Sequence, residues 1–163
     1  MYIFETNKIS KEEFLNLNED NLLFITNPGR MGDEDGITFI MKDNNELTIY
    51  RVDGWLYPKE ENPITLDDAF KQFPKWREAW NNGEKENYNG KYRFIYMGFG
   101  NGLCVDNSIY NEFKPYLDEA VEVFLSKEHP DERESLKYVA VFRSWDDAFV
   151  KMTNDKGYVL KKK

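Results

Sequence analysis

Cysteine and histidine are almost absent from this sequence, which contains one of each, Cys104 and His129. A single cysteine cannot form a disulfide within the chain, so nothing here requires an oxidising compartment. The common tetrahedral zinc sites draw several ligands from Cys and His, and one of each excludes them. The acidic loops do not fit the twelve-residue EF-hand pattern either, so we expect no metal site.

Long apolar runs are missing as well. The longest stretches, 22–25 and 138–142, fall far short of the roughly 20 residues that a membrane-spanning helix needs. The first 25 residues hold five acids and lack the basic start and continuous apolar stretch of a secretory signal. We therefore expect a soluble protein of the cytoplasm that does not associate with membranes.

Nucleotide-binding motifs are also lacking. The chain has no P-loop, and the glycines of its densest cluster, Gly98, Gly100 and Gly102, do not have the spacing of a dinucleotide-binding loop. A predicted strand, and not a helix, follows this cluster directly. A hairpin turn that uses the positive φ angles open to glycine explains it better, and we expect no cofactor.

Positive charge is in deficit, since the formal net charge is −8. Residues 1–80 contain 16 acidic and 9 basic residues, against 14 and 13 in the remainder. Binding to nucleic acid or to an anionic membrane needs a basic patch, so we expect neither partner. The acidity serves solubility or favours a basic protein partner.

Aromatic residues, by contrast, are abundant, at 16% of the chain. Large rings bury much area while losing little rotamer freedom, and 163 residues are enough to form a substantial core. No low-complexity linker interrupts the sequence. We expect a single globular domain over residues 1–163.

Apolar periodicity and turn residues divide the chain into elements. The predicted helices cover about 10–18, 66–73, 74–82, 109–125 and 144–154, and the predicted strands 22–25, 37–42, 46–53, 91–97, 103–105, 137–142 and 158–160. Asn44 and the glycine cluster indicate two hairpin turns. Pro115 is expected to kink or split the long helix.

This pattern predicts an α+β fold with an antiparallel or mixed sheet built from hairpins and about five helices packed mainly on one face. A set of apolar residues on the helix faces should be buried together against the sheet: Leu66, Phe70, Ile109, Phe113, Leu117, Val121, Phe124 and Phe149.

Catalytic candidates are few. Cys104 precedes the long helix, where aligned amides can lower the pKa of a thiol, and His129 is the only imidazole that could act as its base. A cysteine between Leu103 and Val105 is more simply a small buried apolar residue. Two further sets are candidates for binding: Trp55, Trp76 and Trp80 for an aromatic-lined ligand pocket, and Asp33, Glu34 and Asp35 for a partner surface.

No catalytic constellation stands out, whereas acidity and aromatic content do. Our functional hypothesis is therefore a non-enzymatic binding module that recognises another protein, basic in charge, in the manner of an inhibitor or immunity-type protein. The alternatives are a small enzyme using Cys104 and His129, and a protein that binds a small apolar or sugar-like ligand. The sequence leaves the oligomeric state open.

Overall fold

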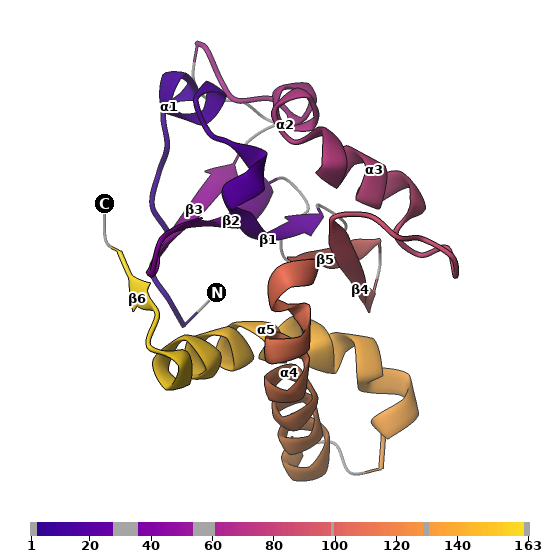
Figure 1. Cartoon of the computed structure of the whole chain (residues 1–163). Coiled ribbons are helices and arrows are strands. Elements are labelled where there is room, and N and C mark those ends of the chain that lie inside the picture. Colours follow the sequence, from indigo (N-terminus) through magenta and orange to yellow (C-terminus); the bar gives the residue numbers. More distant parts are fainter. Residues whose placement is uncertain (1–2, 28–35, 54–60, 99, 129–130, 162–163) are drawn as a thin grey trace.

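The computed structural model describes residues 3–27, 36–53, 61–98, 100–128 and 131–161 (Figure 1). In this part of the chain the helices are α1 (Lys11–Leu15), the 3-10 turn η1 (Glu19–Asn21), α2 (Leu66–Gln72), α3 (Pro74–Asn82), α4 (Asn107–Glu128) and α5 (Arg133–Lys156). The strands are β1 (Leu22–Asn27), β2 (Gly36–Asp43), β3 (Glu46–Asp53), β4 (Tyr92–Gly98), β5 (Asn101–Asp106) and β6 (Val159–Leu160).

The strands form one six-stranded sheet in the order β4-β5-β1-β2-β3-β6. Neighbouring strands are antiparallel except β6, which runs parallel to β3. The predicted α+β class with a mixed sheet is confirmed. Parallel strands need a long connection, and four helices and the β4-β5 hairpin lie between β3 and β6 in the sequence.

Both predicted hairpins are present, and their turns show why. Asn44 connects β2 to β3 with a φ of 55°, a left-handed conformation that asparagine tolerates. Gly98 and Gly100 connect β4 to β5 with φ angles of 85° and 81°. These glycines therefore shape a turn, as their spacing indicated.

Side-chain caps stabilise the first turns of two helices. The Ser10 and Glu13 side chains form a capping box at α1, and Thr65 and Asp68 form one at α2. Pro74 occupies the first turn of α3, where its missing N–H costs no helical hydrogen bond. Because the caps are local, they could be read from the sequence, although α1 ends at Leu15, earlier than expected.

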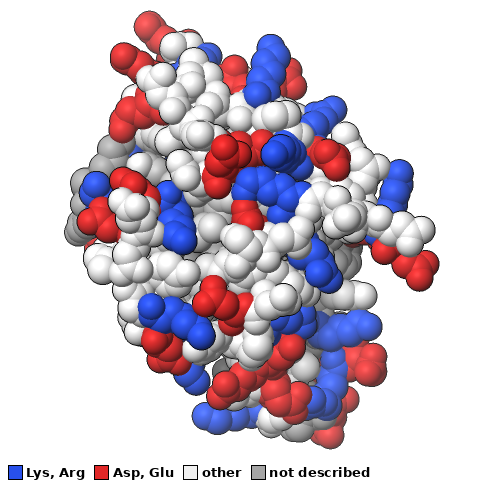
Figure 2. Space-filling model, in the orientation of Figure 1, with Lys and Arg blue, Asp and Glu red and all other residues white. Residues whose placement is uncertain are grey.

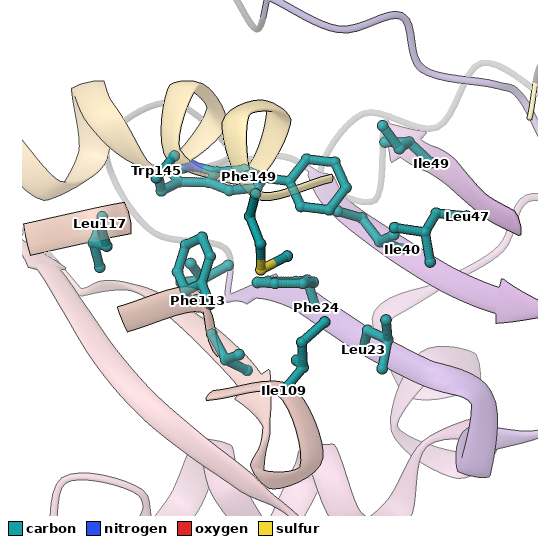
Figure 3. Packing of buried hydrophobic residues seen from close by; sticks show 14 of the residues in the cluster. Leu23, Phe24, Ile40, Leu47, Ile49, Ile109, Phe113, Leu117, Trp145 and Phe149 are labelled. Carbon is teal, nitrogen blue, oxygen red and sulfur yellow. The ribbon is translucent and has the colours of Figure 1, made fainter. Parts of the chain in front are cut away.

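The two long helices cover one face of the sheet (Figures 1 and 3). Phe24 of β1 lies at the centre of this layer, 5.0 Å from the ring of Phe113 and 5.3 Å from that of Phe149. Trp145, Leu117 and residues of β2 and β3 pack around these rings. No helix in the described ranges is long and apolar enough to cross a membrane.

The three short helices α1, α2 and α3 cover the opposite face (Figure 1). Trp76 and Phe73 are fully buried there against β1, β2, β4 and β5. Leu66 and Phe70 pack against this second layer, so their expected burial together with Phe113 is wrong. Helical periodicity identifies the buried side of a helix but not the sheet face that it covers.

A β-bulge in β1 changes which of its residues face each layer. The register with β2 shifts between Leu22 and Phe24. As a result, the adjacent residues Leu23 and Phe24 both face α4 and α5, while Leu22 and Ile25 face the short helices. The continuous apolar run of this central strand reflects burial on both sides.

One local expectation fails in the long helices. Residues 137–142, predicted as a strand, belong to α5, because the apolar run Tyr138–Phe142 is too short for its period to distinguish strand from helix. This helix packs against both α4 and β4, and the Tyr138 ring lies 4.9 Å from the Tyr96 ring of β4. Pro115 lies inside α4, which continues through it without being split.

Candidate functional site

Both ends of the chain lie along the outer edge of β3. β6 pairs with the start of β3, where the Lys161 amide donates to the Leu47 carbonyl at 2.8 Å. Farther along, the Asn7 amide donates to the Ile49 carbonyl at 2.8 Å, and the Arg51 amide donates to the Asn7 carbonyl at 3.0 Å. Two short segments from opposite ends of the sequence thus share this edge, both parallel to β3.

The N-terminal segment is also attached to α5. The Ile3 amide donates to the buried Asp146 carboxylate at 3.1 Å. The Phe4 ring lies 5.6 Å from the Trp145 ring and 5.7 Å from the Phe149 ring. An aromatic side chain from residues 3–7 therefore enters the layer between the sheet and the long helices.

A pocket of about 320 Å³ lies where these segments meet. Its lining is mostly apolar and consists of Ile3, Phe4, Ile49, Val150 and Leu160, with Glu5, Asn7 and Lys161 as the polar members. We call this pocket, together with the exposed apolar side chains beside it, the terminal surface. Those side chains are Ile3, Val159 and Leu160, which are 60%, 54% and 39% exposed.

The charges around the terminal surface are partly neutralised. Lys161 lies 3.6 Å from a carboxylate oxygen of Glu46. The surface therefore offers an apolar pocket with ionic groups at its rim, an arrangement that suits an apolar anchor flanked by polar groups.

The environment of Cys104 is that of a structural residue. Its side chain is fully buried in the layer under the short helices, and burial raises the pKa of its thiol. A thiolate nucleophile needs the opposite shift and access for a substrate. His129 lies outside the described residues, so the pairing of the two remains a sequence-based prediction.

The tryptophan candidates do not line the pocket. Trp76 is fully buried, with its ring 5.5 Å from that of the half-buried Trp80 and 5.1 Å from that of Phe70. These rings form the core between α2 and α3. Trp55 lies outside the described residues.

The acidic candidates Asp33, Glu34 and Asp35 also lie outside the described residues, and their role in partner binding remains a prediction. On the face shown in Figure 2, acidic and basic side chains are interspersed. In the described ranges, no three His, Cys, Asp or Glu side chains gather in a way that could hold a metal ion.

A buried polar group that the sequence did not indicate is Glu19, which is 9% exposed. Its carboxylate accepts hydrogen bonds from the backbone amides of Lys75 and Trp76, at 3.0 and 2.9 Å, and from the Tyr92 hydroxyl at 3.0 Å. Because Phe73 provides no side-chain cap for α3, Glu19 caps this helix from a distance. Its role is structural.

The terminal surface was likewise missed by the sequence reasoning. Its residues come from 3–7, β3, α5 and β6, and no spacing in the sequence connects them. The available signals were the short apolar runs 1–4 and 158–160, each followed by polar sequence. Runs of this kind are too common to predict a site.

The fold and site together define an α+β protein with a mixed six-stranded sheet and an apolar surface where its two ends meet. The chain matches no protein-family model, and comparisons with curated proteins and with solved structures give no significant match.

Proposed function

We propose that this protein is a non-enzymatic module that binds another protein through the terminal surface. The observation that carries the proposal is the grouping of exposed Ile3 and Leu160 around an apolar pocket of about 320 Å³. Exposed apolar side chains that occur singly are normal, whereas a group around a concave site is typical of an interaction surface. Inhibitor or immunity-type binding is the kind of role that fits a protein of this size.

The proposed partner is basic, in keeping with the net charge of −8. Such a charge accelerates the encounter with a basic protein, and salt screens it over about 10 Å at 0.1 M ionic strength. The acids Asp33, Glu34 and Asp35 would contribute to this field. Specific contact would then depend on the apolar pocket, because steering acts mainly on the rate of association.

Replacement of one pocket residue tests the proposal. Leu160→Lys places a charge in the apolar lining, and Val123→Lys introduces the same charge at another exposed apolar position, on α4. Proteins captured from a lysate of the source organism by the wild type would be purified, and their affinities for all three forms measured. We expect Leu160→Lys to weaken binding at least about tenfold, which corresponds to about 1.4 kcal/mol, and Val123→Lys to leave it unchanged. Equal affinity of all three forms would contradict the proposal.

The electrostatic part has its own test. Changing Asp33 to Asn, Glu34 to Gln and Asp35 to Asn removes three charges while keeping side-chain size. We expect this triple variant to associate more slowly with the same partner, and the difference from the wild type to disappear at high salt. An association rate that neither salt nor the triple variant changes would leave these acids as solvated charges.

A small apolar ligand is the second candidate, favoured by the pocket volume, which falls at the lower end of the usual range for ligand sites. A small compound that fills this pocket should raise the melting temperature of the wild type. It should have no such effect on Val150→Trp, in which a larger side chain would occupy the space. Equal stabilisation of both forms would place the compound elsewhere.

A further inference from the structure

We propose that the pocket of the terminal surface takes a large apolar side chain of the partner protein together with one backbone carbonyl oxygen of the same partner segment, and that the Ile49 N–H donates a hydrogen bond to this oxygen. The inference rests on the proposed protein-binding function and states the chemistry by which the partner is recognised. It requires no movement of the chain's own segments, because the pocket is already present beside them.

Ile49 points both of its backbone groups at the outer edge of β3. Its carbonyl accepts the Asn7 amide there at 2.8 Å. In a strand, the N–H and the C=O of one residue lie on the same side, so the Ile49 N–H also faces this edge and not β2. The Arg51 amide, two residues farther on, donates to the Asn7 carbonyl at the same edge, as this alternation requires.

Among the described residues, no backbone carbonyl accepts this N–H. β6 ends at Leu160, and the N-terminal segment pairs with β3 in a bridge at Asn7. A bond from the N–H to the Lys161 carbonyl would extend β6 by one residue, and a bond to the Glu5 carbonyl would add a second bridge. Neither is present in the parts of the chain that the structure describes. Because Ile49 is 3% exposed, its N–H is also shielded from bulk water.

The gap that holds this donor opens into the pocket, because Ile49 and the residues on either side of the gap, Asn7 and Lys161, all line it. Buried backbone N–H groups without an acceptor are rare in native proteins, where a bound molecule or an ordered water satisfies them. The pocket of about 320 Å³ is far larger than the roughly 30 Å³ that one water occupies in the liquid. A water on the N–H would satisfy the donor and leave the apolar walls uncovered, whereas an apolar group that carries an oxygen acceptor matches both.

The charges at the rim favour a neutral acceptor from a basic segment. Lys161 already lies 3.6 Å from a Glu46 carboxylate oxygen, and Glu5 belongs to the lining. A carboxylate ligand would face these two acids on a chain whose net charge is −8. A backbone carbonyl carries no net charge, and lysine or arginine beside the apolar residue would bring cations to the acidic rim. Because every segment has backbone carbonyls, the apolar side chain and its basic neighbours provide the specificity.

Two short peptides provide the direct probe, acetyl-Lys-Ala-Leu-Ala-Lys-amide and a control of equal charge in which serine replaces leucine. Each would be titrated into the isotope-labelled full chain and followed by NMR, and cyclohexanone would be tested alongside as a small ketone without a peptide backbone. We expect the leucine peptide to shift the Ile49 amide proton downfield, because a hydrogen bond forms there, and to shift the already bonded Arg51 amide less. The serine peptide should bind at least about tenfold more weakly, because it lacks the apolar side chain.

Removal of the N–H itself separates recognition from packing. The α-hydroxy acid analogue of isoleucine at position 49 replaces the amide N–H with an ester oxygen and keeps the side chain. We expect this ester form to bind the leucine peptide about five- to tenfold more weakly than the wild type does. Its urea midpoint should fall less than that of the matched ester at position 51, which also removes the bond from the Arg51 amide to the Asn7 carbonyl. Should the ester form fail to fold, Val150→Trp, which fills the pocket, should abolish the peptide-induced shift of the Ile49 amide.

The outcomes separate this inference from the proposed function. An Ile49 amide that the leucine peptide does not shift, equal affinity of the two peptides, or an ester form that binds as tightly as the wild type would overturn the inference. A shift caused by cyclohexanone and not by the peptide would also overturn it and assign the N–H to a small neutral ligand. If a captured partner still lost affinity for Leu160→Lys in these cases, the proposed function would stand without the Ile49 contact. Peptide binding as expected, together with equal affinity of the partner for Leu160→Lys and the wild type, would support the Ile49 site and contradict the proposed function.

Discussion

The two faces of the sheet are covered in different ways. Under α4 and α5, aromatic rings meet edge to face around Phe24, and the centre of the layer is apolar. Under α1, α2 and α3, a carboxylate lies among the rings, where Glu19 connects the start of α3 to Tyr92 of β4. The first layer depends on shape, whereas the second depends also on satisfied hydrogen bonds.

A short helix can be held in place by a carboxylate that is distant from it in sequence. α3 begins without a side-chain cap, and its first free amides point at Glu19. The long helices instead bury an apolar stripe over several turns and do not need such a contact. Four variants, ordered by expected effect, test this difference.

Truncation in the apolar layer should have the largest effect. Phe113→Ala removes a fully buried ring that contacts Phe24, and we expect a loss of about 3 to 5 kcal/mol in the free energy of unfolding. Urea unfolding monitored by circular dichroism would measure it. Val123→Ala, at an exposed position of the same helix, serves as the control and should cost no more than about 0.5 kcal/mol. Similar midpoints for the two variants would mean that this layer does not depend on close packing.

Removal of the buried Glu19 carboxylate should cause the second-largest loss in the free energy of unfolding. Glu19→Ala leaves the amides of Lys75 and Trp76 and the Tyr92 hydroxyl without their acceptor, at an expected cost of about 2 to 3 kcal/mol. Glu19→Gln keeps one acceptor oxygen and should cost less. The same urea experiment measures both, with exposed Asp20→Ala as the control. A Glu19→Ala protein as stable as the wild type would show that the short helices depend on packing, as the long ones do.

Tyr92→Phe should cost less again, about 1 kcal/mol, because Glu19 keeps its two amide donors. Burial raises the pKa of Tyr92, and the Glu19 carboxylate raises it further, so the hydroxyl remains a donor. A double-mutant cycle with Glu19→Ala measures the coupling. We expect the effect of Tyr92→Phe to shrink when Glu19 is absent, and strictly additive effects would argue against a shared network.

The smallest expected change in stability is that of Asp147→Asn, a substitution on α5. The folded-state pKa of Asp147 is raised, chiefly by burial, so its proton favours the folded state at low pH. That stabilisation is fully present below the ordinary pKa of 3.8 and is lost as pH rises through the folded-state value. We therefore expect Asp147→Asn to be slightly more stable than the wild type at about pH 7 and not at about pH 3.

Urea unfolding midpoints of the wild type and of Asp147→Asn, measured at these two pH values, would test the sign of the stability difference. Glu134→Gln, an acid in the first turn of the same helix, is the control and should be destabilising at about pH 7, because acids there favour the helix dipole. An Asp147→Asn variant that is less stable than the wild type at about pH 7 would refute the stated sign.

Local patterns in the sequence were sufficient for much of the fold. The hairpin turns at Asn44 and Gly98 occur as predicted, and the first helix and α2 begin next to Ser10 and Thr65, close to their predicted starts. In each case the conformation depends on residues within a few positions of one another. The apolar run at 138–142 was misassigned because a run of this length does not distinguish strand from helix, and its packing against α4 and β4 appears only in the folded chain.

The candidate site was much less predictable. Cys104 and Trp76 were candidates because their residue types are rare or large, but both belong to the core. The terminal surface instead joins Phe4, Ile49 and Leu160, three ordinary apolar residues in segments that are far apart along the chain. Only the folded sheet brings them together at one edge.

By itself, then, the sequence determined the acidic charge, most of the helices and strands, and the turns that join neighbouring strands, because these follow from composition and short-range stereochemistry. The tertiary structure alone decided which helices cover which face, that Glu19 caps α3, and that both ends of the chain lie along β3. Those arrangements depend on contacts between residues distant in sequence, whose burial and hydrogen bonding become defined only when the whole sheet has formed.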